Sequence, residues 1–229
     1  MHEFVSAVKE SLQSKSDLKK AQWLENYVKH NIRSLGVGIP VIRDIIKEQE
    51  NIFSLRNESL IDQFKILTGL MAGDYAEEKL AAIIYLQLYL VSGSESEVLG
   101  LVSSWFDQNY IYDWNVCDWL CVRVLTPFIN SASAKSIPEF KKWNSSENLW
   151  KARASLVPFA PLKNITEFSD RIYAFSAALI QRKERFCKTA VGWVMREVSR
   201  HDKSYVSRFL SEFSEYTTPE VIKNATKYF

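Results

Sequence analysis

The stretch LAAIIYLQLYL (residues 80–90) decides the fold, because amphipathic helices of the same kind recur along the chain. Its apolar residues stand at the spacing of a helix with one buried side. Similar stretches follow at intervals of roughly 31 to 39 residues, with another predicted helix between successive copies. They are DWLCVRVLTPFI (118–129), KARASLVPFAPL (151–162) and KTAVGWVMREV (188–198). A helix pair repeated at this period predicts an α-solenoid in which the second helix of each pair lines the concave face.

The rest of the chain has the same helical periodicity. It is clearest in FVSAVKESLQS (4–14), AQWLENYVKHNI (21–32) and ESLIDQFKILTGLM (58–71). No run alternates β-branched and polar residues between hairpin turns, and the chain holds only 7 glycines and 6 prolines. We therefore predict an all-α fold, a solenoid of HEAT-like repeats with a concave basic groove, folded as a single domain over residues 1–229. The helices expected between the repeats are SEVLGLVSSWFDQ (96–108), AKSIPEFKKWN (134–144) and EFSDRIYAFSAALIQ (167–181).

The net charge of +2 conceals an uneven distribution of charge along the chain. Residues 51–118 hold 3 lysines and arginines against 10 aspartates and glutamates, whereas residues 119–229 hold 18 against 10. An acidic partner is therefore expected to bind the C-terminal half.

Several classes of function are disfavoured by missing motifs. There is no GxGxxG, GxxxxGK[ST], HExxH or GxSxG, and the three histidines are far apart, so we expect no metal and no cofactor. The first residues lack the apolar region of a signal peptide, and the longest apolar run, residues 80–91, is too short to span a bilayer. A cytoplasmic protein that does not bind membranes is expected. Its cysteines are expected to be reduced core thiols: Cys117, Cys121 and Cys187.

Five residues on the repeated helices are candidates for a functional site. Trp114 and Asp118 stand one helical turn apart in YDWNVCDWLCVR, and a carboxylate on a buried-looking helix is unusual without a partner. Arg153 comes from the third repeat, and Trp193 and Arg196 come from the fourth. In a stack of repeats these side chains are expected to converge in a basic groove with embedded aromatics, which is typical of nucleic-acid binding. The surrounding cations are Arg123, Lys151, Arg182, Lys183, Arg185, Lys188, Arg200, Lys203 and Arg208.

These stretches resemble the AlkD-type DNA alkylation repair glycosylases, which are built from HEAT-like repeats. The resemblance extends over nearly the whole chain, and its most specific parts are WNVCD (114–118), ENLWKARAS (147–155) and AVGWVMRE (190–197). It implies that an active cleft is formed by Trp114, Asp118, Arg153 and Trp193. It also implies that Arg196 grips the DNA backbone and that Tyr27 lies at the edge of the cleft.

The sequence departs from the family pattern at three positions. Gly38 stands where some members have a polar side chain near the DNA, Asn115 replaces an aspartate, and Trp119 follows Asp118 where a small residue is common. None of these changes removes a member of the implied active cleft.

The resemblance implies a monomeric, nucleoid-associated and cofactor-free DNA glycosylase. Its substrates would be N3- and N7-alkylated purines in duplex DNA, such as 3-methyladenine and 7-methylguanine, excised without a deep base-flipping pocket. Asp118 would stabilise the oxocarbenium-like sugar and position the water, while Trp114 and Trp193 attract the cationic groups. Arg153 would hold the flanking phosphate. The other expected DNA contacts are Arg196, Tyr27, Lys188, Lys151 and Arg185.

Simpler alternatives exist for each part. Asp118 could form a structural pair with Arg123, with Arg153 or with a nearby helix N-terminus. Arg153 and Arg196 could lie on a solvated face or form an ion pair within the solenoid, and the basic run QRKERFCK (181–188) could be a solvated face. The whole chain could be a non-catalytic HEAT-repeat protein for distorted or branched DNA, or a protein–protein scaffold. The remaining tryptophans are expected in the core: Trp23, Trp105, Trp119, Trp143 and Trp150.

Overall fold

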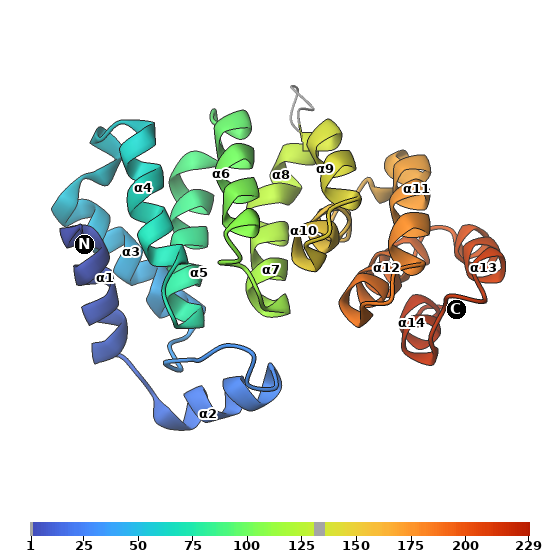
Figure 1. Ribbon diagram of the computed structural model, residues 1–229, viewed down its shortest axis with the longest axis horizontal. Coiled ribbons are helices and arrows are strands. Elements are labelled where there is room, and N and C mark those ends of the chain that lie inside the picture. The colour runs from blue at the N-terminus through green and yellow to red at the C-terminus, as the bar shows by residue number, and fades with distance from the viewer. Residues whose placement is uncertain (1, 131–135) are drawn as a thin grey trace. The chain divides into compact units, whose positions relative to one another are not determined.

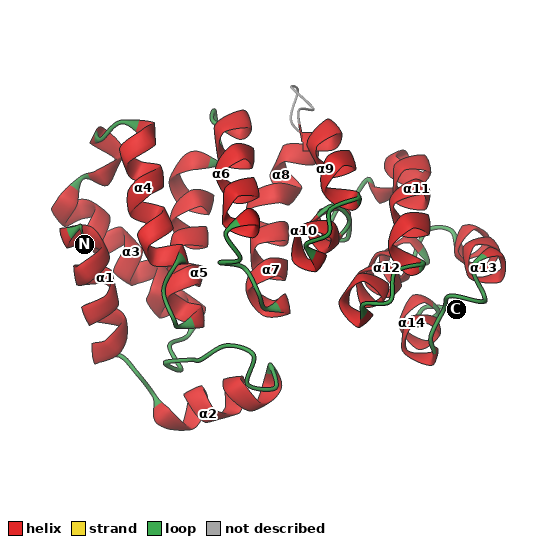
Figure 2. Cartoon of the chain, in the orientation of Figure 1, coloured by secondary structure: helices red, strands yellow, loops and turns green. Residues whose placement is uncertain are grey.

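The computed structural model describes residues 2–130 and 136–229, and it confirms the all-α prediction (Figures 1 and 2). In this part of the chain, helices are joined by loops, and the only β pairing is an isolated bridge between Arg33 and Tyr75. The chain forms two compact units, one ending at Val124 and the other beginning at Leu125. A single domain over all residues therefore stays a prediction. The first part of the predicted helix 134–144 lies outside the described residues, which resume at 136.

The first unit is built from helices α1 to α7. A 3₁₀ turn covers Leu55–Asn57, and π-helical turns extend α5 over Leu86–Leu90 and follow α7 over Cys121–Leu125. The helices are α1 (Glu3–Ser14), α2 (Leu18–Tyr27), α3 (Ile39–Phe53), α4 (Leu60–Met71), α5 (Ala76–Tyr85), α6 (Glu95–Asp107) and α7 (Trp114–Leu120).

Helix α5 is the centre of the first unit, and every one of its residues is buried. It packs against α3, α4 and α7, while α4 also contacts α6, so that the pair α4–α5 stacks on the pair α6–α7. The ring of Phe4 meets the rings of Phe53 and Tyr85, each at 6.0 Å between centroids. Trp105 is fully buried, and its indole Nε1 donates to Thr68 Oγ1 at 2.9 Å. Truncating such a side chain typically costs on the order of 3–5 kcal/mol of stability.

The buried carboxylate of Glu77, at the start of α5, fixes the segment that follows α2. It accepts hydrogen bonds from Ser34 Oγ at 2.7 Å and from the backbone N–H groups of Leu35 and Gly36, both at 2.9 Å. Gly36 has a φ of +78°, and a Cβ there would lie 2.2 Å from the carbonyl oxygen of Asp17. Only glycine allows the segment to approach the start of α2 so closely.

The second unit is built from helices α8 to α14. Short 3₁₀ turns cover Val157–Phe159 and Ile165–Phe168. The helices are α8 (Thr126–Ile129), α9 (Ser136–Asn144), α10 (Leu149–Ala154), α11 (Ser169–Ile180), α12 (Arg185–Val198), α13 (Lys203–Glu212) and α14 (Pro219–Ala225).

Stacked helix pairs also form the second unit. Helix α9 contacts α11, and α10 contacts α12, so that the pair α9–α10 lies on the pair α11–α12. The core is aromatic, with Phe159 meeting Phe140 at 6.5 Å and Phe175 at 6.1 Å between ring centroids. Helix α14 packs on α12 at Gly192, where a Cβ would lie 3.3 Å from the Cα of Val221. The small residue therefore permits the close approach of the two helices.

The repeated stretches found in the sequence are stacked helices in both units. They lie on α5, on α7 and α8, on α10, and on α12, and within each unit the neighbours α5 and α7, or α10 and α12, are in contact. This confirms the predicted stacking of helix pairs, whereas a groove formed by both units stays a prediction. The three cysteines are buried, as expected. No helix in the described residues combines the length and apolar character needed to cross a membrane.

Candidate active site

Helix α7 presents Trp114 and Asp118 on one side. Trp114 is its first residue and Asp118 follows one turn later, and both are half-buried, whereas Val116, Cys117 and Leu120 point into the core. Side chains four residues apart lie above one another on a helix surface. The structure thus agrees with the sequence analysis that an indole and a carboxylate share one face of a helix.

The start of α7 depends on Asp113, which the sequence analysis did not single out. Its Oδ1 accepts hydrogen bonds from the backbone N–H groups of Asn115 at 2.9 Å and Val116 at 3.4 Å. Its other oxygen, Oδ2, is buried and has no hydrogen-bond partner among the described residues. An aspartate directly before the first residue of a helix is a common cap, so this signal was present in the sequence.

The environment of Asp113 opposes its negative charge. Burial raises the pKa of its carboxyl to about 6, against the pull of the N–H groups of Asn115 and Val116, and the charge of nearby Asp118 raises it further. A carboxylate kept in an apolar site is favoured in its neutral form. Asp113, which is buried before the first residue of α7, and Asp118, which is half-buried within it, therefore differ in environment.

An aromatic cluster connects α7 to α2. The ring of Trp114 meets that of Tyr27 at 5.2 Å between centroids with an interplanar angle of 67°. Tyr27 in turn stacks on Trp23 at 5.5 Å and 4°. The predicted edge residue Tyr27 is thus in contact with the predicted site residue Trp114.

The prediction that Trp23 belongs to the core is wrong, since its side chain is 63% exposed. Helix α2 buries Ala21 and half-buries Leu24, and Val28 directly after it is buried. Because the buried face of α2 is this narrow, Trp23 lies on the solvent-exposed face. The other tryptophans expected in the core are buried or, for Trp119, half-buried.

A cavity of about 160 Å³ lies between α2, the segment after it, α5 and α7. Asn115 and Trp119 line it, together with Gly38. These are the three positions at which the sequence departs from the family pattern. The indole of Trp119 also lies under the guanidinium carbon of Arg123, 4.9 Å from the ring centroid. The three departures therefore share one hollow of the first unit.

Arg153 of α10 ties two helices of the second unit together. It is only 4% exposed, and its Nη1 donates to the carbonyl oxygen of Phe186 at 2.6 Å and to Thr189 Oγ1 at 3.2 Å. Both partners lie on the first turns of α12. Lys151, on the same helix α10, is half-buried.

Helix α12 presents Trp193 and Arg196, both half-buried. The guanidinium of Arg196 forms an ion pair with Glu197 at 2.7 Å and donates to Asn224 of α14 at 3.3 Å. An intramolecular ion pair was the alternative considered for this arginine in the sequence. A phosphate contact would have to form alongside these bonds or replace them.

The other expected DNA contacts on α12 also have internal partners. Arg185 forms a bidentate ion pair with Glu220 of α14, in which Nε and Nη2 donate to the two carboxylate oxygens at 2.9 and 2.6 Å. Lys188 Nζ donates to the carbonyl oxygens of Ile180 and Tyr216. The second unit thus compensates much of the charge that the sequence analysis assigned to DNA.

The structure brings the predicted residues together in two sets. Tyr27, Trp114 and Asp118 lie close together in the first unit, and Arg153 reaches the helix of Trp193 in the second. The convergence of both sets in one groove stays a prediction. Among residues 2–130 and 136–229, no three His, Cys, Asp or Glu side chains are placed to bind a metal ion.

Comparisons with known proteins place the chain in a family. Its fold is similar to that of a predicted DNA alkylation repair enzyme from Enterococcus faecalis, with a TM-score of 0.78 and 19% sequence identity over 93% of this chain and 96% of that one. No curated protein matches the chain. The sequence profile of the DNA alkylation repair enzymes matches residues 8–229. The chain therefore belongs to the family of DNA alkylation repair enzymes, and its role lies in DNA repair.

Proposed function

We propose that the protein is a monofunctional DNA glycosylase that hydrolyses the N-glycosidic bond of N3- and N7-alkylated purines in duplex DNA. The observation that carries this proposal is the pairing of Trp114 and Asp118 on one side of α7, with Tyr27 against the indole. Membership of a DNA alkylation repair family supports the substrate class. The protein acts as a monomer and without a cofactor.

The chemistry follows from the charge of the damaged base. An N3- or N7-alkylated purine is cationic, so it leaves without being protonated. As the bond breaks, positive charge builds on the deoxyribose. Asp118 stabilises this charge as a carboxylate and positions the attacking water. The indole of Trp114 adds cation–π attraction on the order of 1–2 kcal/mol when desolvated.

The second unit contributes a second indole and the grip on the DNA backbone. Trp193 faces the cationic base or sugar, and Arg153 holds the flanking phosphate while its bonds to Phe186 and Thr189 fix its position. Backbone contacts come from Arg196, Lys188, Lys151 and Arg185. The internal partners of these cations mean that DNA phosphates compete with Glu197 and Glu220 for them.

The test is the release of 7-methylguanine from a duplex that carries a single such base. We expect rapid release by the wild type and at least a hundredfold slower release by Asp118→Asn, on the order of the loss seen when one electrostatic group is removed from an active site. The matched control is Asp44→Asn, which changes an exposed carboxylate on α3 of the same unit and should leave the rate unchanged.

Other outcomes select other functions. If Asp118→Asn releases the base as fast as the wild type does, the proposed role of this carboxylate is refuted. If the wild type binds duplex DNA with a steep salt dependence but releases no base, the chain is a non-catalytic DNA-binding protein. If it does not bind DNA, a protein–protein scaffold becomes the better explanation.

A further inference from the structure

An exposed tryptophan on α2 has no role in the proposed reaction. Trp23 is 63% exposed and lies parallel to Tyr27, with 4° between the ring planes and 5.5 Å between their centroids. Together with Trp114 these rings form a continuous row from α7 to the surface of α2. Tyr27 covers one face of the indole, and much of the rest is open to solvent.

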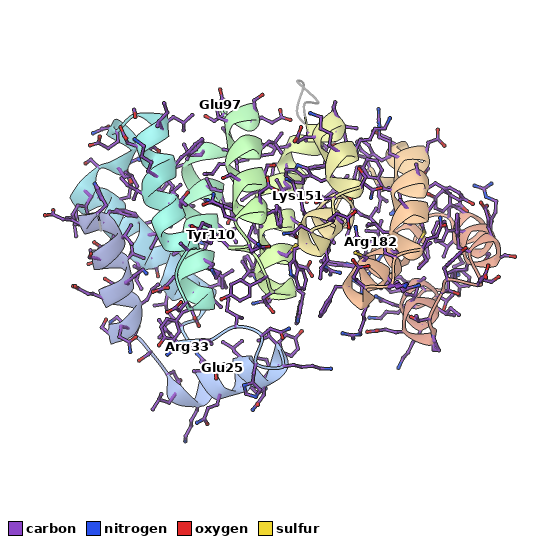
Figure 3. All side chains as sticks on the ribbon, viewed as in Figure 1. Glu25, Arg33, Glu97, Tyr110, Lys151 and Arg182 are labelled. Carbon is purple, nitrogen blue, oxygen red and sulfur yellow. The ribbon has the colours of Figure 1, made fainter. Side chains whose placement is uncertain are left out.

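The other side of α2 fixes the position of this row. Ala21 is buried, and Glu25 accepts a hydrogen bond from the backbone N–H of Ser34 at 2.9 Å. Figure 3 shows Glu25 beside the segment that carries Arg33. At the start of the helix, the N–H of Asp17 donates to the carbonyl oxygen of Leu35 at 2.8 Å. Trp23 is therefore held in place by the helix that carries it.

The charges around Trp23 favour an anionic partner. Lys19, Lys20 and Lys29 are exposed, and none of them forms an ion pair with the described residues. Of the nearby carboxylates, Asp17 caps α2 through the N–H groups of Lys19 and Lys20, and Glu25 is bonded to Ser34. A flat aromatic surface among unpaired cations is the combination by which proteins bind unstacked bases beside a phosphate backbone.

We propose that Trp23 is a DNA-binding residue whose indole stacks on a base that has left the double helix. The inference rests on the proposed function, since it needs DNA at the face of Trp114 and Tyr27. A base stacked on the open face of Trp23 continues the row Trp114, Tyr27 and Trp23. Lys19 and Lys20 then neutralise the phosphates of the displaced nucleotide and its neighbour. The contact depends on the π-face of the base and tolerates any sequence.

The test compares two labelled duplexes by fluorescence anisotropy, one fully paired and one with a single unpaired base. We expect Trp23→Ala to weaken binding of the bulged duplex by about tenfold, the usual effect of removing one base-stacking ring, and binding of the paired duplex by less than about twofold. Trp23→Tyr retains a ring and should restore most of the affinity. Leu18→Ala is the matched control, since Leu18 is 79% exposed on the same helix but has no ring.

Each result has a distinct meaning. Equal affinities of Trp23→Ala and wild type for the bulged duplex would overturn the inference, and so would an equal loss on both duplexes. Failure of Trp23→Tyr to restore binding would also overturn it, because a stacking role needs only an aromatic face. If the wild type binds neither duplex, the proposed function itself fails. That failure is seen with the wild type alone and is therefore distinct from a failure of the inference about Trp23.

Discussion

On α12, Arg185 is bonded to Glu220 and Arg196 to Glu197, so both cations have acidic partners within the second unit. On α2, Lys19 and Lys20 are exposed and form no ion pair with the described residues. Charge counts along the sequence place the basic surface in residues 119–229, which hold 18 lysines and arginines. The comparison teaches that carboxylates near a cation in the folded unit, whether adjacent in the chain like Glu197 or distant like Glu220, decide which cations remain to bind phosphate.

Two buried charged residues, one in each unit, differ in their hydrogen-bond partners. Arg153 is buried and donates hydrogen bonds to Phe186 and Thr189, whereas Asp113 is buried with one oxygen that accepts no hydrogen bond from the described residues. A buried charge with partners holds helices together, and one without a full set of partners costs stability. The first unit therefore carries an incompletely bonded buried charge at Asp113, the residue that caps the helix of Asp118.

The largest effect is expected from Arg153→Ala. The change removes the buried guanidinium and its hydrogen bonds to Phe186 and Thr189, which tie α10 to α12, so we expect the free energy of unfolding to fall by about 3 kcal/mol. Chemical denaturation measures it. The control Lys183→Ala changes an exposed side chain and should shift the value by less than about 0.5 kcal/mol. A wild-type value for Arg153→Ala would contradict the structural tie.

The next effect concerns Asp113→Asn and depends on pH. The pKa of Asp113 in the folded protein is about 6, above its ordinary value of 3.8, so the folded state binds the proton more tightly. This group favours folding at low pH, and its contribution is lost as the pH rises from about 4 to about 6. Asparagine keeps the cap without the charge. Denaturation at several pH values should show the stability difference in favour of Asp113→Asn growing by about 3 kcal/mol between pH 3 and pH 7. A difference independent of pH would contradict the burial of a charged carboxylate.

A third measurement determines which unit provides the cations that are accessible to DNA. The double variant Lys19→Ala, Lys20→Ala should weaken binding to duplex DNA by about tenfold at low salt and reduce the slope of log Kd against log salt by about 1.8. Arg185→Ala should change the slope much less, because Glu220 already neutralises that arginine. The opposite ranking would mean that Arg185 binds phosphate in spite of its ion pair with Glu220, and it would break the comparison.

The smallest effect is expected from Glu220→Gln. Losing the carboxylate releases Arg185, so duplex affinity at low salt should rise by about threefold and the salt slope should steepen by at most about 0.9. Anisotropy titrations at several salt concentrations measure both. Glu215→Gln, an exposed change in the same unit, is the control. Unchanged binding would mean that Arg185 does not reach DNA even when its partner is lost.

Much of the fold was predictable because helix periodicity and a repeat of helix pairs are local signals. The stretches at 80–90 and 188–198 were predicted to be helices on this basis, and helical structure covers both. Trp23 was misplaced because periodicity states that a helix has a buried side but does not state how wide that side is. Helix α2 buries a single residue, Ala21, so the indole two positions later is outside.

The site was predictable only where its residues share one helix. The spacing of Trp114 and Asp118 fixed their common side, whereas the contact of Trp114 with Tyr27 depends on how α2 packs. Arg185 and Glu220 are 35 residues apart in the chain, so no local sequence pattern predicts their ion pair. Asp113 was missed although its position before the helix was visible, because its buried, partly unbonded carboxylate exists only in the folded chain.

The hydrogen bonds to the Glu77 carboxylate affect the order in which parts of the first unit unfold locally. Helix α2 contributes little to the core, so the segment 34–37 that Glu77 holds is its main attachment. The amides of α2 and of Leu35 to Val37 should therefore exchange with solvent deuterium as one cooperative group, well before those of α5. Trp23 and Tyr27 then lie on a part of the first unit that opens before α5, and a nucleic acid bound there should slow that exchange.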